Sequence, residues 1–180
     1  MKLFATAAAL ALCAGAALAE NPMVGGAAMM ADMNIVENAM NSADHTTLVA
    51  AVQAAGLAET LMGEGPFTVF APTNEAFAAL PAGTVDTLLM PENKEALTHV
   101  LLCHVVGAEA FSTDIVGMIE ADGGSHQVET LGGCMLTAAM QDGMVTLTDE
   151  QGRTATVTIA DVDQSNGVIH VIDSVLLPAM

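Results

Sequence analysis

The chain changes its hydrophobic period part-way along, and this change most restricts how it can fold. Between residues 32 and 104 apolar side chains recur at intervals of three and four, as in Leu48, Val52 and Ala55, which predicts helices. From residue 123 onward, glycine-containing turns separate runs rich in Val, Ile and Thr, which predict strands. Helices that come first and strands that come last indicate an α+β domain, in which a helical layer covers an antiparallel sheet.

Turn and cap residues mark the ends of the expected elements. Gly56 is placed to end a helix, and Thr73 or Asn74 to begin one. We predict helices over 73–80, 84–90, 91–104 and 112–120, two further helices between 32 and 63, and a buried strand over 67–70. The turns expected between the later strands are Gly123-Gly124, Gly132-Gly133, Asp142-Gly143 and Asn166-Gly167.

The first nineteen residues have the pattern of a secretory signal peptide. Lys2 is followed by about 17 uncharged, Ala-rich residues that end in Ala17-Leu18-Ala19. A retained membrane anchor is the alternative, but this stretch is barely long enough to span a bilayer and no basic residue follows it. Lipid attachment at Cys13 is disfavoured because bulky Leu12 precedes it. We therefore expect cleavage after residue 19 and no membrane insertion of the mature chain.

The mature chain is expected to hold one domain. Residues 20–31 lack periodicity and contain Pro22, Gly25 and Gly26, so we expect a flexible leader followed by a domain over 32–178. The strong cations that remain are Lys94 and Arg153, against 21 carboxylates, so the formal charge is 2 − 21 = −19. Such a surface repels phosphate, which excludes binding to nucleic acid and to anionic lipid.

Three segments in register identify the chain as similar to the fasciclin domain family. They are Gly65 to Phe77 (GPFTVFAPTNEAF), Leu101 to Val106 (LLCHVV), and Asn166 to Asp173 (NGVIHVID) followed by Val175 to Pro178. The resemblance spans residues 32–178 and implies a helical layer packed on a wedge of two β-sheets. It also implies a secreted or periplasmic binding module without catalysis or cofactor, which adheres to a cell-surface or extracellular matrix protein or polysaccharide. We expect it to be a monomer.

The resemblance also implies particular binding residues. An Asp-Ile pair and a Tyr-His pair take part in recognition in animal members of the family, and the matching positions here are Asp161-Val162 and Cys103-His104. Asp161, Val162 and His104 are therefore the predicted partner-binding residues. The family's Tyr is replaced by Cys103, which places the Tyr-His role in doubt and suggests a bridge to Cys134 instead.

The residue types alone leave the state of the two cysteines open. An even pair in an oxidising compartment favours a structural disulfide between Cys103 and Cys134, with two buried thiols as the alternative. Redox catalysis is disfavoured because the chain has no Cys-x-x-Cys motif and no cation beside either cysteine.

Histidine and methionine side chains are the candidate metal ligands of this chain. His99 and His104 are five residues apart and would diverge on a helix, and we interpret His104 and His170 as structural histidines. No calcium-loop or zinc-protease motif is complete, so we predict no metal site. The alternative function is a periplasmic copper or small-ligand carrier, because thioether sulfur is a soft ligand for Cu(I). The methionines of the leader that could supply it are Met23, Met29, Met30 and Met33. A purely structural role in the cell envelope is a third hypothesis.

Overall fold

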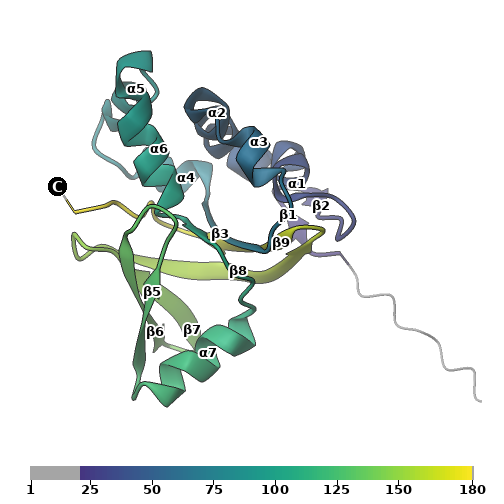
Figure 1. The fold of residues 1–180 in the computed structure, drawn as a ribbon, viewed down its shortest axis with the longest axis vertical. Coiled ribbons are helices and arrows are strands. Elements are labelled where there is room, and N and C mark those ends of the chain that lie inside the picture. Colours follow the sequence, from purple (N-terminus) through teal and green to yellow (C-terminus); the bar gives the residue numbers. More distant parts are fainter. Residues whose placement is uncertain (1–20, 180) are drawn as a thin grey trace, which may run out of the picture.

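The structure is a computed structural model that describes residues 21–179, and it divides into a helical part and a strand part (Figure 1). The first part holds β1 (Met23–Val24), β2 (Ala27–Ala28), α1 (Ile35–Asn41), η1 (Ala43–His45), α2 (Thr46–Ala55), α3 (Ala58–Leu61), β3 (Phe67–Pro72), α4 (Asn74–Ala78), α5 (Thr84–Leu88), η2 (Pro91–Asn93) and α6 (Lys94–Leu102). The second part holds β4 (Val105–Val106), α7 (Ser112–Ala121), β5 (Ser125–Glu129), β6 (Met135–Gln141), β7 (Met144–Thr148), β8 (Thr154–Gln164) and β9 (Gly167–Ile172).

Seven strands form one mixed sheet, in the order β4-β3-β9-β8-β7-β6-β5. The strand β8 pairs with β7 over residues 154–156 and with β9 over residues 157–164, so the two sheets of the expected wedge are continuous through β8. The expected α+β fold class is confirmed. The expectation of a purely antiparallel sheet was wrong, because β3 and β9 run parallel from Phe67↔Gly167 to Pro72↔Ile172.

The domain has two hydrophobic cores, and the core under helices α1 to α6 also takes in side chains of the second part, such as Val162 and Ile169. In Figure 1 helices α1 to α6 lie over the β3, β9 and β8 end of the sheet, and α7 lies beside β5, β6 and β7. Successive residues of β3 serve both cores: Val69 and Ala71 belong to the helical core, whereas Phe70 belongs to the strand core. This alternation follows from the two-residue period of a strand and makes β3 the wall between the cores.

The leader differs from its prediction. Residues 23–28 form a two-stranded ribbon, and the side chains of Val24 and Met29 are buried in the helical core. The apolar character of these two side chains outweighs the flexibility that Gly25 and Gly26 confer, so the packed domain begins before residue 32. The predicted signal peptide lies outside the described residues, and within residues 21–179 no helix has the length and hydropathy of a transmembrane span.

Several expected caps and turns are present. Gly56 ends α2 with a φ of 74°, and the hydroxyl of Thr73 accepts a hydrogen bond from the amide of Ala76 at the start of α4. The Asn166-Gly167 turn presses against β3 so closely that a Cβ on Gly167 would lie 2.0 Å from the carbonyl oxygen of Phe67. Glycine is therefore required there by the close approach of two backbones.

Candidate functional site

The first candidate site lies at an irregularity in β8. The pairing of β8 with β9 shifts register between Ile159 and Val162, and Asp161 has a φ of 57°. Its exposed carboxylate accepts hydrogen bonds from the backbone N–H of Ser112 at 2.6 Å and from the Ser112 hydroxyl at 2.5 Å. Because Ser112 is the first residue of α7, the bulge of β8 fixes where that helix begins.

His170 connects this bulge to the segment before α7. Its Nδ1 accepts a hydrogen bond from the backbone N–H of Asp161 at 3.2 Å, and its Nε2 donates to the carbonyl oxygen of Ala110 at 2.8 Å. The ring is buried and stacks on Phe70, with 5.7 Å between the ring centroids. Burial lowers the pKa of His170, so the neutral ring that these two hydrogen bonds require is the favoured form.

Thr68 holds the same segment from the other side. Its hydroxyl donates to the carbonyl oxygen of Ala108 at 2.5 Å and accepts from the backbone N–H of Ala110 at 2.9 Å. Residues 108–112, here called the clamp loop, are thus fixed to β3 by Thr68, to β9 by His170 and to β8 by Asp161. Sequence reasoning missed Thr68 and Ser112, because nothing local marks a side chain whose partners lie more than forty residues away.

The predicted recognition pair Asp161-Val162 is divided by the fold. Asp161 is exposed, whereas the side chain of Val162 is 0% exposed and packs in the helical core. A partner can therefore touch the carboxylate but not the valine. Val162 instead anchors the strand from which Asp161 projects.

His104 is also inside the fold, where it cannot contact a partner directly. Its Nδ1 donates to the carbonyl oxygen of Val100 at 2.8 Å, and its Nε2 accepts from the backbone N–H of Leu176 at 2.9 Å. Burial lowers the pKa of His104 to about 4, which keeps the ring neutral. The structural interpretation of this histidine agrees with its contacts. Its place among the partner-binding residues stays a prediction, and because only 2% of it is exposed it could act there only through the residues around it.

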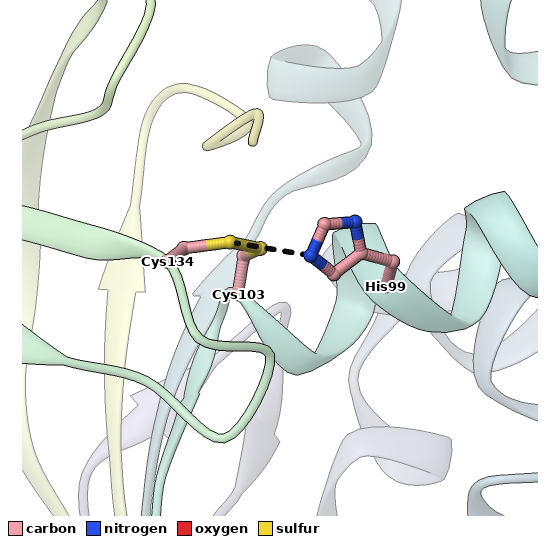
Figure 2. A group of neighbouring side chains, drawn as sticks. All are labelled: His99, Cys103 and Cys134. Atoms are coloured by element: carbon pink, nitrogen blue, oxygen red, sulfur yellow. Dashed lines mark hydrogen bonds between the residues drawn. A yellow bond between two sulfur atoms is a disulfide. The ribbon is translucent and has the colours of Figure 1, made fainter. Parts of the chain in front are cut away.

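The two cysteines form a disulfide beside His99 (Figure 2). Cys103 ends α6, Cys134 precedes β6, and their Cα atoms are 5.3 Å apart. The Nε2 of His99 lies 3.9 Å from the sulfur of Cys134 and 3.0 Å from the carbonyl oxygen of Gly132. His99 and the cysteines are close enough to suggest a metal site, but sulfurs bonded to each other are not thiolates, so this oxidised form offers no soft ligand set.

Sequence reasoning did not bring His99 to this cluster. The four-residue spacing of His99 and Cys103 on a helix was the signal that could have found it. The other spacing argument was correct, since His99 faces the Gly132 turn while His104 faces the core.

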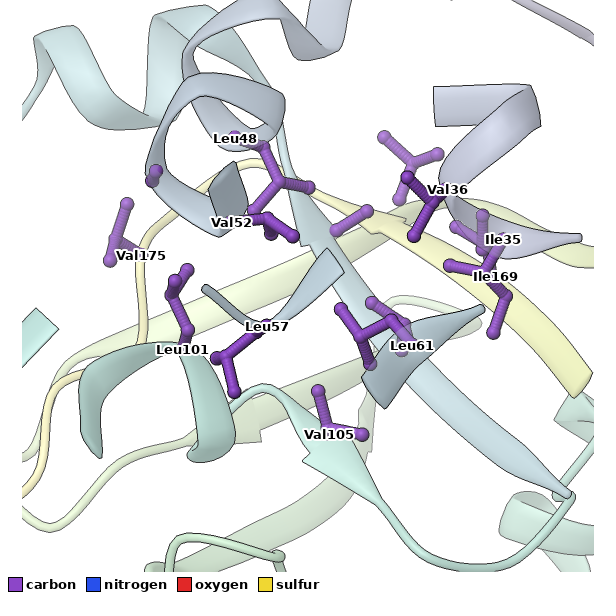
Figure 3. Packing of buried hydrophobic residues seen from close by; sticks show 14 of the residues in the cluster. Ile35, Val36, Leu48, Val52, Leu57, Leu61, Leu101, Val105, Ile169 and Val175 are labelled. Carbon is purple, nitrogen blue, oxygen red and sulfur yellow. The ribbon is translucent and has the colours of Figure 1, made fainter. Parts of the chain in front are cut away.

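The helical core contains a pocket that is nearly filled. It lies among the side chains shown in Figure 3, including Ile35, Leu57 and Val105. Its volume of about 30 Å³ is close to that of one water molecule. This core is therefore a packed scaffold and leaves no room for a ligand unless the helices move.

The fasciclin domain model matches residues 43–178, which cover the strand core, most of the helical core, the clamp loop and the disulfide. The chain belongs to the fasciclin family. Fasciclin domains are generally non-catalytic binding domains. The solved structure of a fasciclin domain pair from the insect cell adhesion molecule Fasciclin I has a TM-score of 0.71 and 19% identity, covering 81% of this chain and 51% of that one.

Two relatives in sequence extend the comparison. Protein sll1483 of Synechocystis sp. is 50% identical over 161 residues, which cover 89% of this chain and 82% of that protein. The cell surface glycolipoprotein MPB83 of Mycobacterium bovis is 35% identical over 168 residues, which cover 89% of this fasciclin chain and 68% of that protein.

Proposed function

We propose that this fasciclin domain is an exported, non-enzymatic module that adheres to a cell-surface or matrix partner through the exposed surface around Asp161. The observation that carries the proposal is the geometry of Asp161, whose carboxylate is exposed yet held at a fixed position by two hydrogen bonds. A preorganised charge of this kind costs little entropy when a partner binds it.

Charge defines the partner that this surface fits. Asp163 lies two residues further along β8 and is also exposed, so two carboxylates project from the same strand. With a formal charge of −18 for the whole chain, the domain attracts a basic protein surface or a polysaccharide that carries amino groups. Acidic polysaccharides would need bridging cations.

Export and adhesion are supported by several independent features. The first nineteen residues have a secretory pattern, and a disulfide persists in oxidising compartments. One relative is named as a cell surface glycolipoprotein, and the protein of similar fold is named as a cell adhesion molecule. Together they favour a secreted or periplasmic location and a partner outside the cytoplasm.

A non-catalytic role agrees with how the buried histidines are used. Two of the three buried histidines, His104 and His170, use both ring nitrogens in hydrogen bonds within the chain, so neither has a free nitrogen with which to move a proton. The third, His45, bonds Ser42 through Nδ1 and has a buried Nε2 without a partner among the described residues. His104 and His170 hold the C-terminal segment and the clamp loop in place.

Binding of the mature domain to immobilised envelope from its own cells tests the proposal. Asp161→Asn keeps an oxygen that can accept from Ser112 but removes the charge, so we expect binding to fall at least about tenfold, as for loss of a charge that contacts a partner. Ser112→Ala keeps the charge and removes one hydrogen bond, and we expect it to bind nearly as well as the parent chain. Glu95→Gln, at an exposed position on α6, is the matched control for a general loss of negative charge.

The outcomes distinguish a specific role of the Asp161 carboxylate from a general effect of negative charge. Equal binding by the parent and Asp161→Asn would contradict a role of the carboxylate. A loss that is as large in Glu95→Gln would show that overall charge, not this position, attracts the partner.

The alternative, a copper or small-ligand carrier that uses the leader, has less support. Of the four methionines, Met29 is buried at 2% exposure, whereas Met23 and Met30 are 60% and 39% exposed. Deleting the leader would also remove core side chains, so the sharper test is Met23→Leu with Met30→Leu. A Cu(I) titration in which this double variant binds less metal than the parent chain would favour the carrier over the adhesion module.

A further inference from the structure

The two edge strands of the sheet, β4 and β5, approach each other at one end. The turn after β5 bonds to the chain around β4, with Leu131 N–H donating to the carbonyl oxygen of Val105 at 2.8 Å and Gly132 N–H donating to that of Leu102 at 3.1 Å. The disulfide closes the same end. Away from it, β5, α7 and residues 106–110 enclose a groove with a volume of about 350 Å³.

The lining of this groove is mainly apolar. Phe70 and Leu147 belong to the strand core, and Ile115, Met118 and Val128 extend the lining onto α7 and β5. A volume of about 350 Å³ falls within the range of roughly 300 to 1,000 Å³ that is usual for small-molecule sites. It contrasts with the pocket of about 30 Å³ in the helical core.

One wall of the groove is preorganised. Thr68 and His170 hold Ala108 and Ala110 of the clamp loop, and these alanines line the groove. Their small side chains leave the space open while their backbone hydrogen bonds keep the wall in position. Binding of a ligand therefore costs little entropy for ordering this loop.

The charged groups of the lining are almost all acidic. Glu109, Asp114 and Glu129 line the groove, and Glu109 and Glu129 are exposed. Asp114 accepts from the backbone N–H of Phe111, so the two glutamates are the freer carboxylates. No Lys or Arg is among the residues that line the groove, and His126 pairs with Asp122 at 2.6 Å. A fatty acid or another anion would be repelled there, whereas an ammonium group would be attracted.

We propose that this groove binds a small cationic amphiphile, with its apolar body between α7 and β5 and its ammonium group between Glu109 and Glu129. Burial of the hydrocarbon supplies the affinity, and the two carboxylates select the sign of the head group. Asp161 is not among the residues that line the groove, so the proposal of a ligand site there does not depend on the proposed adhesion surface.

The direct test uses decyltrimethylammonium as the probe, below its micelle-forming concentration, with the mature disulfide-bonded domain. Calorimetry should show saturable binding of one molecule, and methyl NMR should show shifts at Ile115, Met118 and Val128. Decyl sulfate carries the same tail with the opposite charge and should bind at least roughly tenfold more weakly. Tetramethylammonium lacks the tail and should produce no saturable shift.

Variants then assign the two parts of the site. Glu109→Gln combined with Glu129→Gln should weaken decyltrimethylammonium several-fold, since each exposed ion pair contributes little by itself. Glu59→Gln combined with Glu95→Gln removes the same charge from exposed positions on α3 and α6, outside the groove lining, and should change binding by less than about twofold, because distant exposed charges are screened. Val128→Trp fills the groove from an edge strand and should abolish binding while the amide spectrum stays folded.

Three results would overturn the proposal. The first is equal binding of decyl sulfate and decyltrimethylammonium. The second is a set of methyl NMR shifts centred on Ile35 and Leu48 of the helical core instead of on the groove. The third is an unchanged affinity for decyltrimethylammonium in the variant that combines Glu109→Gln with Glu129→Gln. The last comparison does not depend on whether Val128→Trp folds.

Discussion

The helical core and the strand core are built on the same sheet but are covered very differently. Helices α1 to α6 close over the β3 and β9 end, and the space left inside that core is about 30 Å³. A single helix, α7, covers the β5 to β7 end, and a groove of about 350 Å³ remains beside it. This difference suggests that the tightly packed helical part contributes more to stability, whereas the strand part has room for a ligand. Strand β3 and the clamp loop lie between them.

Equal truncations in the two cores test this division most strongly. Leu101 in the helical core and Leu147 in the strand core are 4% and 0% exposed. We expect Leu101→Ala to lower the free energy of unfolding by about 4 kcal/mol, because the sealed core must keep the new cavity empty. Leu147→Ala should cost about 3 kcal/mol, because its space merges with the groove and can be hydrated. Urea unfolding measures both, and a larger cost for Leu147→Ala would contradict the comparison.

The disulfide tests how firmly the two parts are joined. Cys103 and Cys134 are 31 residues apart in sequence, and a loop of that size contributes roughly 3.5 kcal/mol by chain entropy. Cys103→Ala with Cys134→Ala should lose about this amount in urea unfolding. Adding a reductant should destabilise the parent chain similarly and leave the double variant unchanged. A parent chain that is insensitive to reductant, with free thiols by mass spectrometry, would contradict the bridge.

The helices and strands were predictable because their signals are local. Periodicity, caps and turn residues gave the end of α2 at Gly56, and they gave α6, α7 and β3 close to their observed bounds. Between residues 32 and 63 the structure has three α-helices where two were predicted. The parallel pairing of β3 with β9 was not predictable in this way, because it joins residues about a hundred positions apart and both strands are simply apolar. The buried ribbon around Val24 was missed because Gly25-Gly26 followed by two alanines looks like a linker.

The candidate site was predictable only in part. The resemblance pointed to Asp161, but it could not distinguish the exposed Asp161 from the buried Val162, since burial depends on how the bulge turns β8. The groove was not predictable at all. Its lining comes from five separated segments whose residues, taken one by one, are ordinary core or surface residues.

The buried histidines give the next prediction, which concerns pH. Burial lowers the pKa of His104 from 6.5 to about 4, and it lowers the pKa of His45 and His170 as well. Above pH 6.5 both the folded and the unfolded chain are neutral at these rings. Between pH 6.5 and 4 the unfolded chain takes up protons that the folded chain does not, so stability falls as pH falls.

The expected loss is roughly 3 kcal/mol for His104 alone over this range. Urea unfolding at pH 7, 6, 5 and 4 measures the slope. A stability that is flat from pH 7 to pH 4 would contradict the neutral, buried state of the histidines.

Asp161 gives the smallest expected effect, at the junction of the two parts. Asp161→Ala removes both hydrogen bonds to Ser112 and places a less tolerant residue at a φ of 57°, so it should cost about 1 to 2 kcal/mol of stability. Asp161→Asn keeps an acceptor and tolerates this φ, so it should cost less than about 0.5 kcal/mol. Hydrogen exchange should show faster opening of the first turn of α7 in the alanine variant and not in the asparagine variant. Asparagine preserves the fold but lacks the charge, so Asp161→Asn should keep the stability of the parent chain and lose adhesion. Equal destabilisation by both substitutions would mean that the charge of Asp161, and not its capping hydrogen bonds, holds the clamp loop.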